Sequence, residues 1–164
     1  MLIERLKTDH DRQAFDCGEP SLNDYLRRFA RQNDEKGLGR TFVAVEPGSM
    51  DILGYYTLSS GGVRFDAVPV KLPRYPVPVA HLARLAVDLK HRGKRIGETL
   101  LIDALARAAR ASDQLGIHAV EVIALDEAAK AFYLKYGFTP LLDVPLHLYL
   151  PMKTIRKLNL NRAP

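Results

Sequence analysis

One stretch of the chain places three cations and two glycines directly before an amphipathic segment: Arg92, Gly93, Lys94, Arg95, Ile96 and Gly97. A basic, glycine-containing turn at the start of a helix suits phosphate binding, because the N–H groups of the first helical turn point outward at the positive end of the helix dipole. The turn matches neither GxxxxGKS/T nor GxGxxG, so it gives no support for nucleotide hydrolysis. On these residues alone, an ordinary strand-to-helix turn is an equal alternative.

Tyr133 is the candidate for proton transfer. Its phenol stays protonated at neutral pH and can donate its proton to a stronger base that forms nearby. However, Ala129, Phe132, Tyr133 and Tyr136 are spaced as i, i+3, i+4 and i+7. Because this spacing is typical of a buried helix stripe, periodicity alone favours core packing for Tyr133.

Arg84 is the candidate for substrate binding outside the basic turn. It lies in the otherwise apolar stretch Leu82–Val87, where a cation is costly unless it is paired or faces a cleft. We expect Arg84 to face a substrate phosphate, with a structural ion pair as the alternative.

The sequence predicts no metal site. The histidines form neither HExxH nor another metal-ligand spacing; they are His10, His81, His91, His118 and His147. The single cysteine, Cys17, excludes an intramolecular disulfide and a multi-cysteine zinc site. We interpret Cys17 as a small buried residue.

The charge distribution favours a polyanionic ligand. The net charge is +5, from 24 Lys and Arg against 19 Asp and Glu. Three clusters are poor in acids: the first contains Arg27, Arg28, Arg31, Lys36 and Arg40, the second spans 90–95, and the third contains Lys153, Arg156, Lys157 and Arg162. A solubilising surface explains any one of them, but three in a chain of 164 residues favour contacts to a polyanion. Arg28, Arg31 and Lys36 are the candidate contacts to such a ligand.

The elements that position these residues alternate between strand and helix. Ser21 is a favourable N-cap residue, and the apolar residues Leu22, Tyr25, Leu26, Phe29 and Ala30 predict an amphipathic helix that ends before Gly37. A second helix runs from the basic turn to about Ser112. A third is capped by Asp126, spans 127–136 and ends at Gly137.

Strands are expected at 2–6, 40–45, 52–58, 79–87, 119–125, 138–142 and 146–150. The stretch 119–125 is nearly all apolar and predicts a strand that is buried on both faces. The proline-rich segment between Pro69 and Pro78 predicts an irregular excursion. The resulting fold class is α/β, or α+β by a stricter definition. We expect a mixed twisted sheet flanked by helices, in a single domain over 1–164.

We expect a cytoplasmic protein. The chain lacks an apolar run of the roughly 18 residues that a membrane helix needs. Its N-terminal segment MLIERLKTDH carries charges too early for a secretory signal.

The stretch from about Arg40 to Pro151 resembles the GNAT family of acyl-CoA-dependent N-acetyltransferases. The turn at 92–97 resembles that family's Q/R-x-x-G-x-G/A motif, except that Arg95 stands where glycine is expected. At this position Arg95 needs a negative φ or else incurs a left-handed penalty of about 1–2 kcal/mol. This departure bears on the affinity for the cofactor.

A second set of residues narrows the resemblance. The segment Phe15–Leu26, FDCGEPSLNDYL, is similar to the opening of GNAT toxins from toxin–antitoxin modules, the TacT and AtaT type. Gly54–Ser59, the proline-rich excursion and Leu82–Asp88 resemble the same group. This resemblance implies an acetyl-CoA-dependent enzyme that acetylates the α-amino group of aminoacyl-tRNA and so blocks translation. It also implies a ribbon-helix-helix antitoxin as partner, and a homodimer.

The resemblance assigns roles to individual residues, and it implies that RNA is the polyanion contacted by Arg28, Arg31 and Lys36. It implies that Tyr133 is the general acid and that the backbone N–H of Val87 is the oxyanion donor. It places the pantetheine against Leu85, Ala86 and Val87 and the pyrophosphate on the turn, and it extends the cofactor site to Asp126, Ala129 and Phe132. Two alternatives remain: an N-acetyltransferase for a small amine or a protein N-terminus, and a non-catalytic CoA-binding module.

Overall fold

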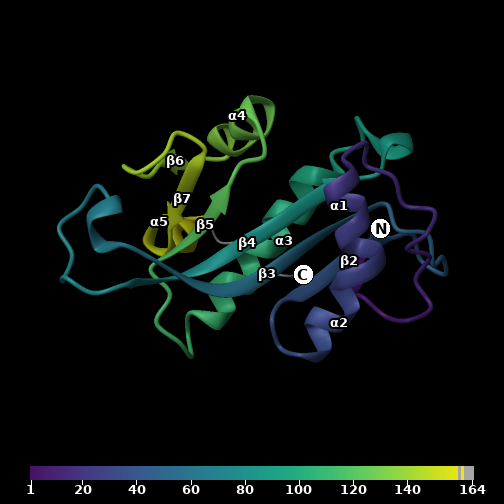
Figure 1. Ribbon diagram of the computed structural model, residues 1–164, viewed down its shortest axis with the longest axis horizontal. Coiled ribbons are helices and arrows are strands. Elements are labelled where there is room, and N and C mark those ends of the chain that lie inside the picture. The colour runs from purple at the N-terminus through teal and green to yellow at the C-terminus, as the bar shows by residue number, and fades with distance from the viewer. Residues whose placement is uncertain (159, 161–164) are drawn as a thin grey trace. The chain divides into compact units, whose positions relative to one another are not determined.

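The computed structural model describes residues 1–158 and 160 (Figure 1). Arg162 of the third basic cluster lies outside these residues. The helical segments are α1 (Pro20–Asp24), a π turn (Tyr25–Phe29), α2 (Ala30–Glu35), α3 (Ile96–Ala111), α4 (Glu127–Lys135), α5 (Met152–Lys157) and two 3-10 turns (Phe65–Ala67 and Leu89–His91). The strands are β1 (Leu2–Arg5), β2 (Arg40–Val45), β3 (Gly54–Val63), β4 (Val77–Val87), β5 (Ala119–Ile123), β6 (Thr139–Pro140) and β7 (His147–Pro151).

The strands follow the order β1-β2-β3-β4-β5-β7-β6 in a mixed sheet, which confirms the predicted fold class. The chain forms two compact units, and each of their boundaries falls inside a continuous element, namely β3, β4 or α3. The first unit comprises 1–59 and 83–104, and the second comprises 60–82 and 105–164. The expectation of a single domain stays a prediction.

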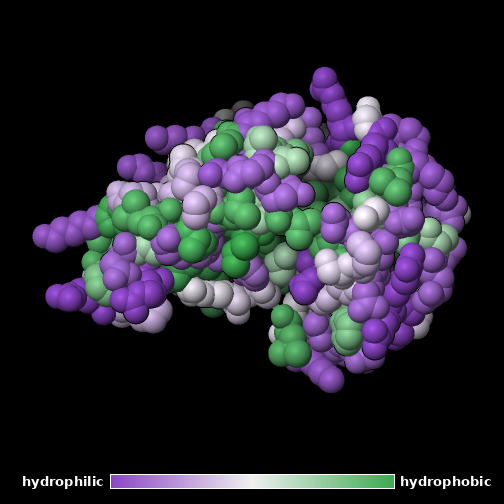
Figure 2. Space-filling model, turned by 45° about the horizontal axis from the view of Figure 1, so that its top comes forward, coloured by the Kyte–Doolittle hydropathy of each residue, from purple (hydrophilic) through white to green (hydrophobic). Residues whose placement is uncertain are grey.

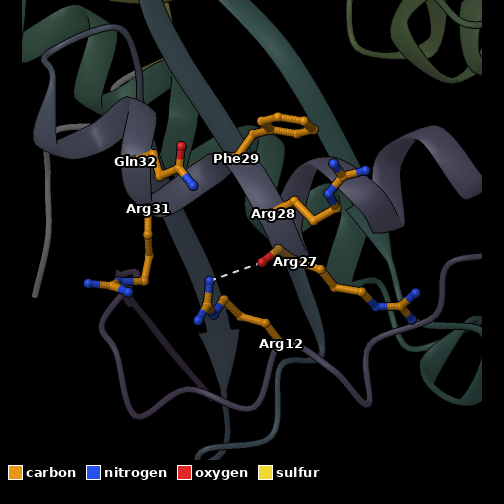
Figure 3. A pocket seen from close by; sticks show the side chains of 6 residues that line it. All are labelled: Arg12, Arg27, Arg28, Phe29, Arg31 and Gln32. Atoms are coloured by element: carbon orange, nitrogen blue, oxygen red, sulfur yellow. Dashed lines mark hydrogen bonds between the residues drawn. The ribbon is translucent and has the colours of Figure 1, made fainter.

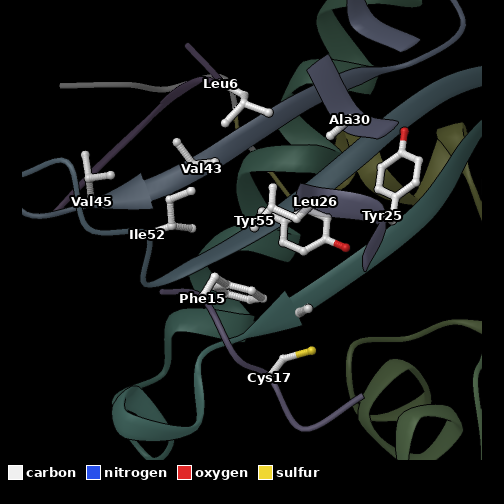
Figure 4. Packing of buried hydrophobic residues seen from close by; sticks show 11 residues of the cluster. Leu6, Phe15, Cys17, Tyr25, Leu26, Ala30, Val43, Val45, Ile52 and Tyr55 are labelled. Atoms are coloured by element: carbon white, nitrogen blue, oxygen red, sulfur yellow. The ribbon is translucent and has the colours of Figure 1, made fainter. Parts of the chain in front are cut away.

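The first unit is built on the antiparallel strands β1, β2 and β3. Leu2 lies opposite Val45, and Arg40 lies opposite Leu58. A buried cluster joins the helical segments to these strands, and Leu26 and Tyr55 in it are fully buried (Figure 4). The Tyr55 hydroxyl donates to the Leu22 carbonyl at 2.7 Å, which anchors the helical segment to β3.

The second unit contains the parallel pair of the sheet. Val79 of β4 lies opposite Ala119 of β5, and β7 pairs in antiparallel fashion with both β5 and β6. Its apolar cluster combines residues of β4 and β7 with the loop residues Val68 and Leu141. The long helix α3 has an apolar stripe that is buried in both units and consists of Ile96, Leu100, Leu101, Ala104, Leu105 and Ala108.

The first helical segment begins earlier than the sequence predicts. Pro20 occupies its first turn and Glu19 is the N-cap residue, without a capping hydrogen bond from its side chain. The predicted cap at Ser21 is therefore wrong. Proline suits this position because its fixed φ fits the first turn of a helix and its missing N–H is not needed there.

The same segment contains a π turn that the sequence analysis missed. The N–H of Ala30 bonds to the carbonyl of Tyr25, five residues earlier, and Phe29 has φ −117° and ψ −29°. The extra residue in this turn moves Phe29 out of the predicted apolar stripe. Phe29 is 41% exposed, whereas Ala30 is fully buried.

Several strand boundaries also differ from the prediction. β3 extends to Val63 through small residues, and β4 starts at Val77 and so contains Pro78. Pro78 is tolerated because it contributes its carbonyl, which accepts from the His118 N–H at 2.8 Å, and proline lacks only the donor.

The C-terminal elements show the remaining differences. The prediction that 119–125 is buried on both faces is wrong at its end, because Ile123 and Leu125 are 59% and 53% exposed. β6 has two residues rather than the five expected, and α5 was not predicted. The predicted cap of α4 is confirmed: the Asp126 carboxylate accepts from the Ala129 N–H at 2.8 Å, and Gly137, with φ 96°, follows the helix.

Candidate functional site

The basic turn lies between the end of β4 and the start of α3. Gly93 and Arg95 both adopt positive φ values, 80° and 60°. A hydrogen bond from the Thr99 N–H to the Arg95 carbonyl (3.1 Å) marks the first turn of α3. The N–H groups of Ile96 and Gly97 in that turn therefore have no acceptor within the helix, which is the arrangement that binds phosphate oxygens.

The turn is exposed and anchored at one point. Arg92, Gly93, Lys94 and Arg95 are all exposed. The Arg92 guanidinium also donates to the Cys17 carbonyl at 3.0 Å, which ties the turn to the N-terminal loop. Cys17 is buried, as predicted. Of the two conformations that the sequence left open for Arg95, the structure shows the left-handed one. The exposed cations are accessible to an anionic ligand.

A buried aspartate, Asp88, organises the chain between β4 and the turn. Its carboxylate accepts from the N–H groups of Lys90 (2.8 Å) and Asp16 (3.1 Å), and its own N–H donates to the Leu53 carbonyl. The sequence analysis missed Asp88. An aspartate just after a strand and two residues before a lysine, in a position to form an Asx turn, is the signal that could have indicated it.

The end of β4 carries the residues expected to contact the pantetheine. Ala86 is buried, and Leu85 and Val87 are half-buried. Gly54 of β3 packs against this segment: an added Cβ there would lie 2.9 Å from the Ala86 carbonyl oxygen. Gly54 is therefore a second residue that the analysis missed, since only glycine permits this approach of the backbone.

Arg84 makes a contact that the sequence did not predict. Its guanidinium lies over the ring of Tyr25, 3.6 Å from the centroid. Stacking on a buried tyrosine offsets part of the cost of half-burying the cation. The expectation that Arg84 faces a substrate phosphate stays a prediction.

The second unit holds Tyr133 and its neighbours on α4. Tyr133 is only 6% exposed, and its ring lies 5.2 Å from that of Phe132 and 5.3 Å from that of Phe138. The periodicity argument for burial is thus confirmed. Burial raises the pKa of the Tyr133 phenol well above its usual value, so the hydroxyl keeps its proton at neutral pH. The predicted cofactor residues Asp126 and Ala129 lie at the start of the same helix, which Asp126 caps by accepting from the Ala129 N–H.

The candidate RNA residues lie on the π turn and α2. Arg28 pairs with Asp24 at 3.3 Å and Arg31 with Glu35 at 3.1 Å, and Lys36 follows the last turn. Arg28 and Arg31 line a hollow of about 420 Å³ (Figure 3). Arg12 and Arg27, which the sequence analysis did not select, line it as well.

The analysis also missed a polar cluster across β4, β5 and β7. Glu121 is buried and accepts from His81 and from His147 Nε2, the latter at 2.5 Å. His147 Nδ1 lies 2.7 Å from Asp143. The histidines lie far apart in the sequence, so only the pairing of the strands brings them to one carboxylate.

The described residues contain neither a metal-binding cluster nor a helix that could span a membrane. No group of three or more His, Cys, Asp and Glu residues there is arranged to hold a metal ion. Each helix in the same part of the chain is too short or too polar to cross a bilayer.

Comparison with known proteins decides the family. The acetyltransferase (GNAT) domain family matches residues 37–140, more than half of the chain. The chain belongs to the GNAT acetyltransferase family. The predicted family and its mixed-sheet fold are confirmed, while the turn before α3 has Arg95 in place of the glycine of the expected motif.

Several relatives of this GNAT chain are toxins. It is 42% identical over 157 residues to a tRNA-acetylating toxin of Mycobacterium tuberculosis (strain ATCC 25618 / H37Rv), with 94% of this chain and 93% of the relative covered. It is 34% identical to AtaT complexed with acetyl-methionyl-tRNAfMet, with a TM-score of 0.89 and coverage of 96% and 98%. It is 33% identical to a mutant AtaT toxin bound to acetyl-CoA and the C-terminus of the antitoxin AtaR, with a TM-score of 0.84 and 96% of each chain covered. The predicted resemblance to the TacT and AtaT type is thereby confirmed.

Proposed function

We propose that this GNAT protein transfers the acetyl group of acetyl-CoA to the α-amino group of an aminoacyl-tRNA and acts as a toxin that blocks translation. The observation that carries the proposal is the 42% identity, over nearly the whole length of both chains, to a tRNA-acetylating toxin. The solved complex of AtaT with an acetylated methionyl-tRNA supports the same substrate class.

We assign acetyl-CoA to β4, the basic turn and the start of α3. The N–H groups of Ile96 and Gly97 would bind phosphate oxygens, with added charge from the exposed Arg92, Lys94 and Arg95. Leu85, Ala86 and Val87 would pair with the pantetheine through their backbone. Asp126, Ala129 and Phe132 of the second unit are the further cofactor contacts that the family resemblance suggests.

Acetyl-CoA supplies a thioester carbonyl that an amine can attack. The N–H of Val87 is proposed to donate to the carbonyl oxygen as negative charge develops on it, which lowers the barrier to attack. Tyr133 then gives its phenolic proton to the departing sulfur as the carbon–sulfur bond breaks. The attacking nitrogen loses one proton to water as the amide forms, and water returns one proton to the Tyr133 phenolate, so the two transfers balance and the phenol is restored.

The substrate amine needs no strong base. An α-amino group with a pKa of about 7.7–8.0 is partly neutral at pH 7, whereas a lysine amine near 10.4 is almost fully protonated. An ester on the neighbouring carbon lowers the pKa of the α-amine further. Water or a weak base suffices, and a buried catalytic carboxylate pair is not required.

The partners follow from the relatives. The AtaT complex with part of AtaR supports an antitoxin partner for this chain. A ribbon-helix-helix fold for that antitoxin, a homodimer of this chain and a cytoplasmic location where charged tRNA occurs are the finer parts of the proposal.

A transfer assay tests the proposed substrate class. Labelled acetyl-CoA is supplied with a pool of charged tRNAs, and deacylated tRNA and free amino acids serve as controls. Label on the charged pool alone is expected. Label on the free amino acids would indicate a small-amine acetyltransferase, and acetyl-CoA binding without any transfer would indicate a binding module.

A further inference from the structure

The hollow beside the π turn has an unusual lining. Six residues form it, of which four are arginines and none is acidic: Arg12, Arg27, Arg28, Phe29, Arg31 and Gln32. In Figure 3 the guanidinium groups of Arg12 and Arg31 lie on the same side of the helix. Arg12 is held by a hydrogen bond to the Arg27 carbonyl at 3.1 Å, and Arg27 by one to the Phe15 carbonyl. Arg12 and Arg27 are therefore fixed to the backbone.

Phe29 is the one aromatic residue of this lining, and the π turn puts it there. In a regular α-helix Phe29 would share a face with Tyr25 and Leu26, which are buried. Because the turn holds one extra residue, Ala30 takes the buried position and Phe29 is 41% exposed. π turns are frequent at functional sites, since they re-aim a side chain at a cost in helix stability.

The surroundings of Phe29 match the chemistry of a nucleotide. The Arg28 guanidinium lies 5.1 Å from the ring centroid, so a flat cation and an aromatic face are side by side. The pairs of Arg28 with Asp24 and of Arg31 with Glu35 are largely exposed and so contribute little energy. Phosphate oxygens can replace these carboxylates. Figure 2 shows that apolar side chains interrupt a mostly hydrophilic face of the molecule. In the lining of the hollow, Phe29 lies among four arginines.

We infer that this hollow binds an unpaired nucleotide of the RNA substrate, whose base stacks on Phe29 while the adjoining phosphates contact Arg12 and Arg31. The inference rests on the proposed function, because it concerns the same RNA. Bases that are not paired can stack on an aromatic ring whatever their sequence, whereas bases within a duplex present no free face. An acidic peptide would use the arginines but would gain nothing from the ring.

Binding of labelled RNA by Phe29→Ala tests this inference. Fluorescence anisotropy is measured with a single-stranded oligoribonucleotide and with a duplex of the same length. We expect Phe29→Ala to weaken single-strand binding about tenfold or more and to leave duplex binding unchanged. Phe29→Trp should retain the affinity. Tyr75→Ala, which removes a 63% exposed aromatic side chain outside the hollow, is the matched control and should have no effect.

The salt dependence separates the ring from the arginines. Arg31→Gln should reduce the slope of log affinity against log salt by about 0.7, the value for one phosphate on a single strand. Phe29→Ala should leave the slope unchanged. Unchanged single-strand affinity in Phe29→Ala, or equal weakening for strand and duplex, would overturn the inference. If the variants lost affinity for an oligoglutamate peptide but kept their affinity for single-stranded RNA, the inference would be overturned in favour of an acidic protein partner.

Acetylation assays distinguish this inference from the proposed function. If the wild-type protein acetylates charged tRNA and Phe29→Ala has the same KM, the nucleotide site is wrong and the function stands. If the wild-type protein does not acetylate charged tRNA but single-strand binding depends on Phe29, the function is wrong and the nucleotide site stands.

Discussion

The backbone of Arg95 adopts φ 60°, a conformation that glycine tolerates and that costs other residues about 1–2 kcal/mol. Related GNAT turns were expected to have glycine at this position. The retained arginine places a guanidinium at the start of α3, beside the helix N–H groups that we assign to phosphate. At this turn the protein thus exchanges some folding stability for an added positive charge.

Replacement of Arg95 by glycine tests this exchange. We expect Arg95→Gly to raise the free energy of unfolding by about 0.5–1 kcal/mol, because the relief of strain exceeds the entropy cost of glycine. Affinity for acetyl-CoA should fall. Thermal unfolding and calorimetric titration measure the two effects. Lys94→Gly is the matched control: its backbone has no positive φ to relieve, so this substitution should lower stability.

Tyr133 combines a packing role and a proposed catalytic role, which one substitution can separate. Tyr133→Phe keeps the ring between Phe132 and Phe138 and removes only the hydroxyl. We expect kcat to fall by about 100-fold or more, with little change in Tm or in the Kd for acetyl-CoA. Tyr136→Phe on the same helix is the comparison variant. Equal kcat values for the two variants would contradict the role of Tyr133.

At the scale of elements, the strands β4, β5 and β7 bring four titratable residues together. Burial opposes charge on both Glu121 and His147, but their mutual hydrogen bond, together with His81 and Asp143, lowers the pKa of Glu121 and raises that of His147. The pKa of Asp143 is lowered as well. Because both ring nitrogens of His147 face carboxylates, the imidazole is held in its charged form.

This cluster predicts a pH optimum of stability. A raised pKa for His147 stabilises the fold fully below about pH 6.5, and this stabilisation is lost as the pH rises through the folded pKa. Lowered pKa values for Glu121 and Asp143 stabilise it above about pH 4, and this is lost as the pH falls further. Tm should therefore be highest near about pH 5–6 and decline toward pH 9.

The variant His147→Gln tests the source of this decline. It should lower Tm at pH 6 and flatten the fall between pH 6 and pH 9, as measured by thermal unfolding across the pH range. His91→Gln, which alters a histidine of the other unit, should keep the wild-type profile. A profile of His147→Gln parallel to that of the wild type would assign the pH dependence to other groups.

The elements differ in how far the sequence could predict them. Strand β2 and the Asp126 cap were predicted correctly, because alternation of β formers and a capping carboxylate are local signals. The π turn was missed because Tyr25 and Phe29 are four apart in the sequence, as on one face of a regular helix. The sequence gives no sign of the extra residue that the turn holds. The contacts of Gly54 and Glu121 were missed for another reason, since they depend on which strands lie side by side.

At the scale of the whole molecule, the positive charge and the candidate site residues are unevenly distributed. The net charge of +5 is modest, but three of the four arginines of the first basic cluster, Arg27, Arg28 and Arg31, line one hollow. The catalytic and cofactor candidates fall in both compact units. Family resemblance indicated their roles from the sequence, whereas composition and periodicity indicated only a basic globular protein with a buried Tyr133.

The salt dependence of tRNA affinity follows from this distribution. Each phosphate contact contributes a slope of about 0.7–0.9 to the fall of log affinity with log salt. The double reversal Arg28→Glu and Arg31→Glu should weaken binding of charged tRNA and reduce the slope by about 1.4–1.8. Reversal at Lys153 and Arg156 on α5 compares the third basic cluster. Wild-type affinity in the first double variant would contradict the RNA contacts assigned to the π turn and α2.

The central claim concerns the atom that receives the acetyl group, and mild alkaline treatment of the product tests it directly. Charged tRNA is labelled with acetyl-CoA and the protein, and the ester is then hydrolysed so that the amino acid leaves the RNA. We predict that the label leaves as N-acetyl-amino acid and that Tyr133→Phe strongly reduces its yield. Label that stays on the RNA after hydrolysis would place the acetyl group on a nucleotide and contradict the account.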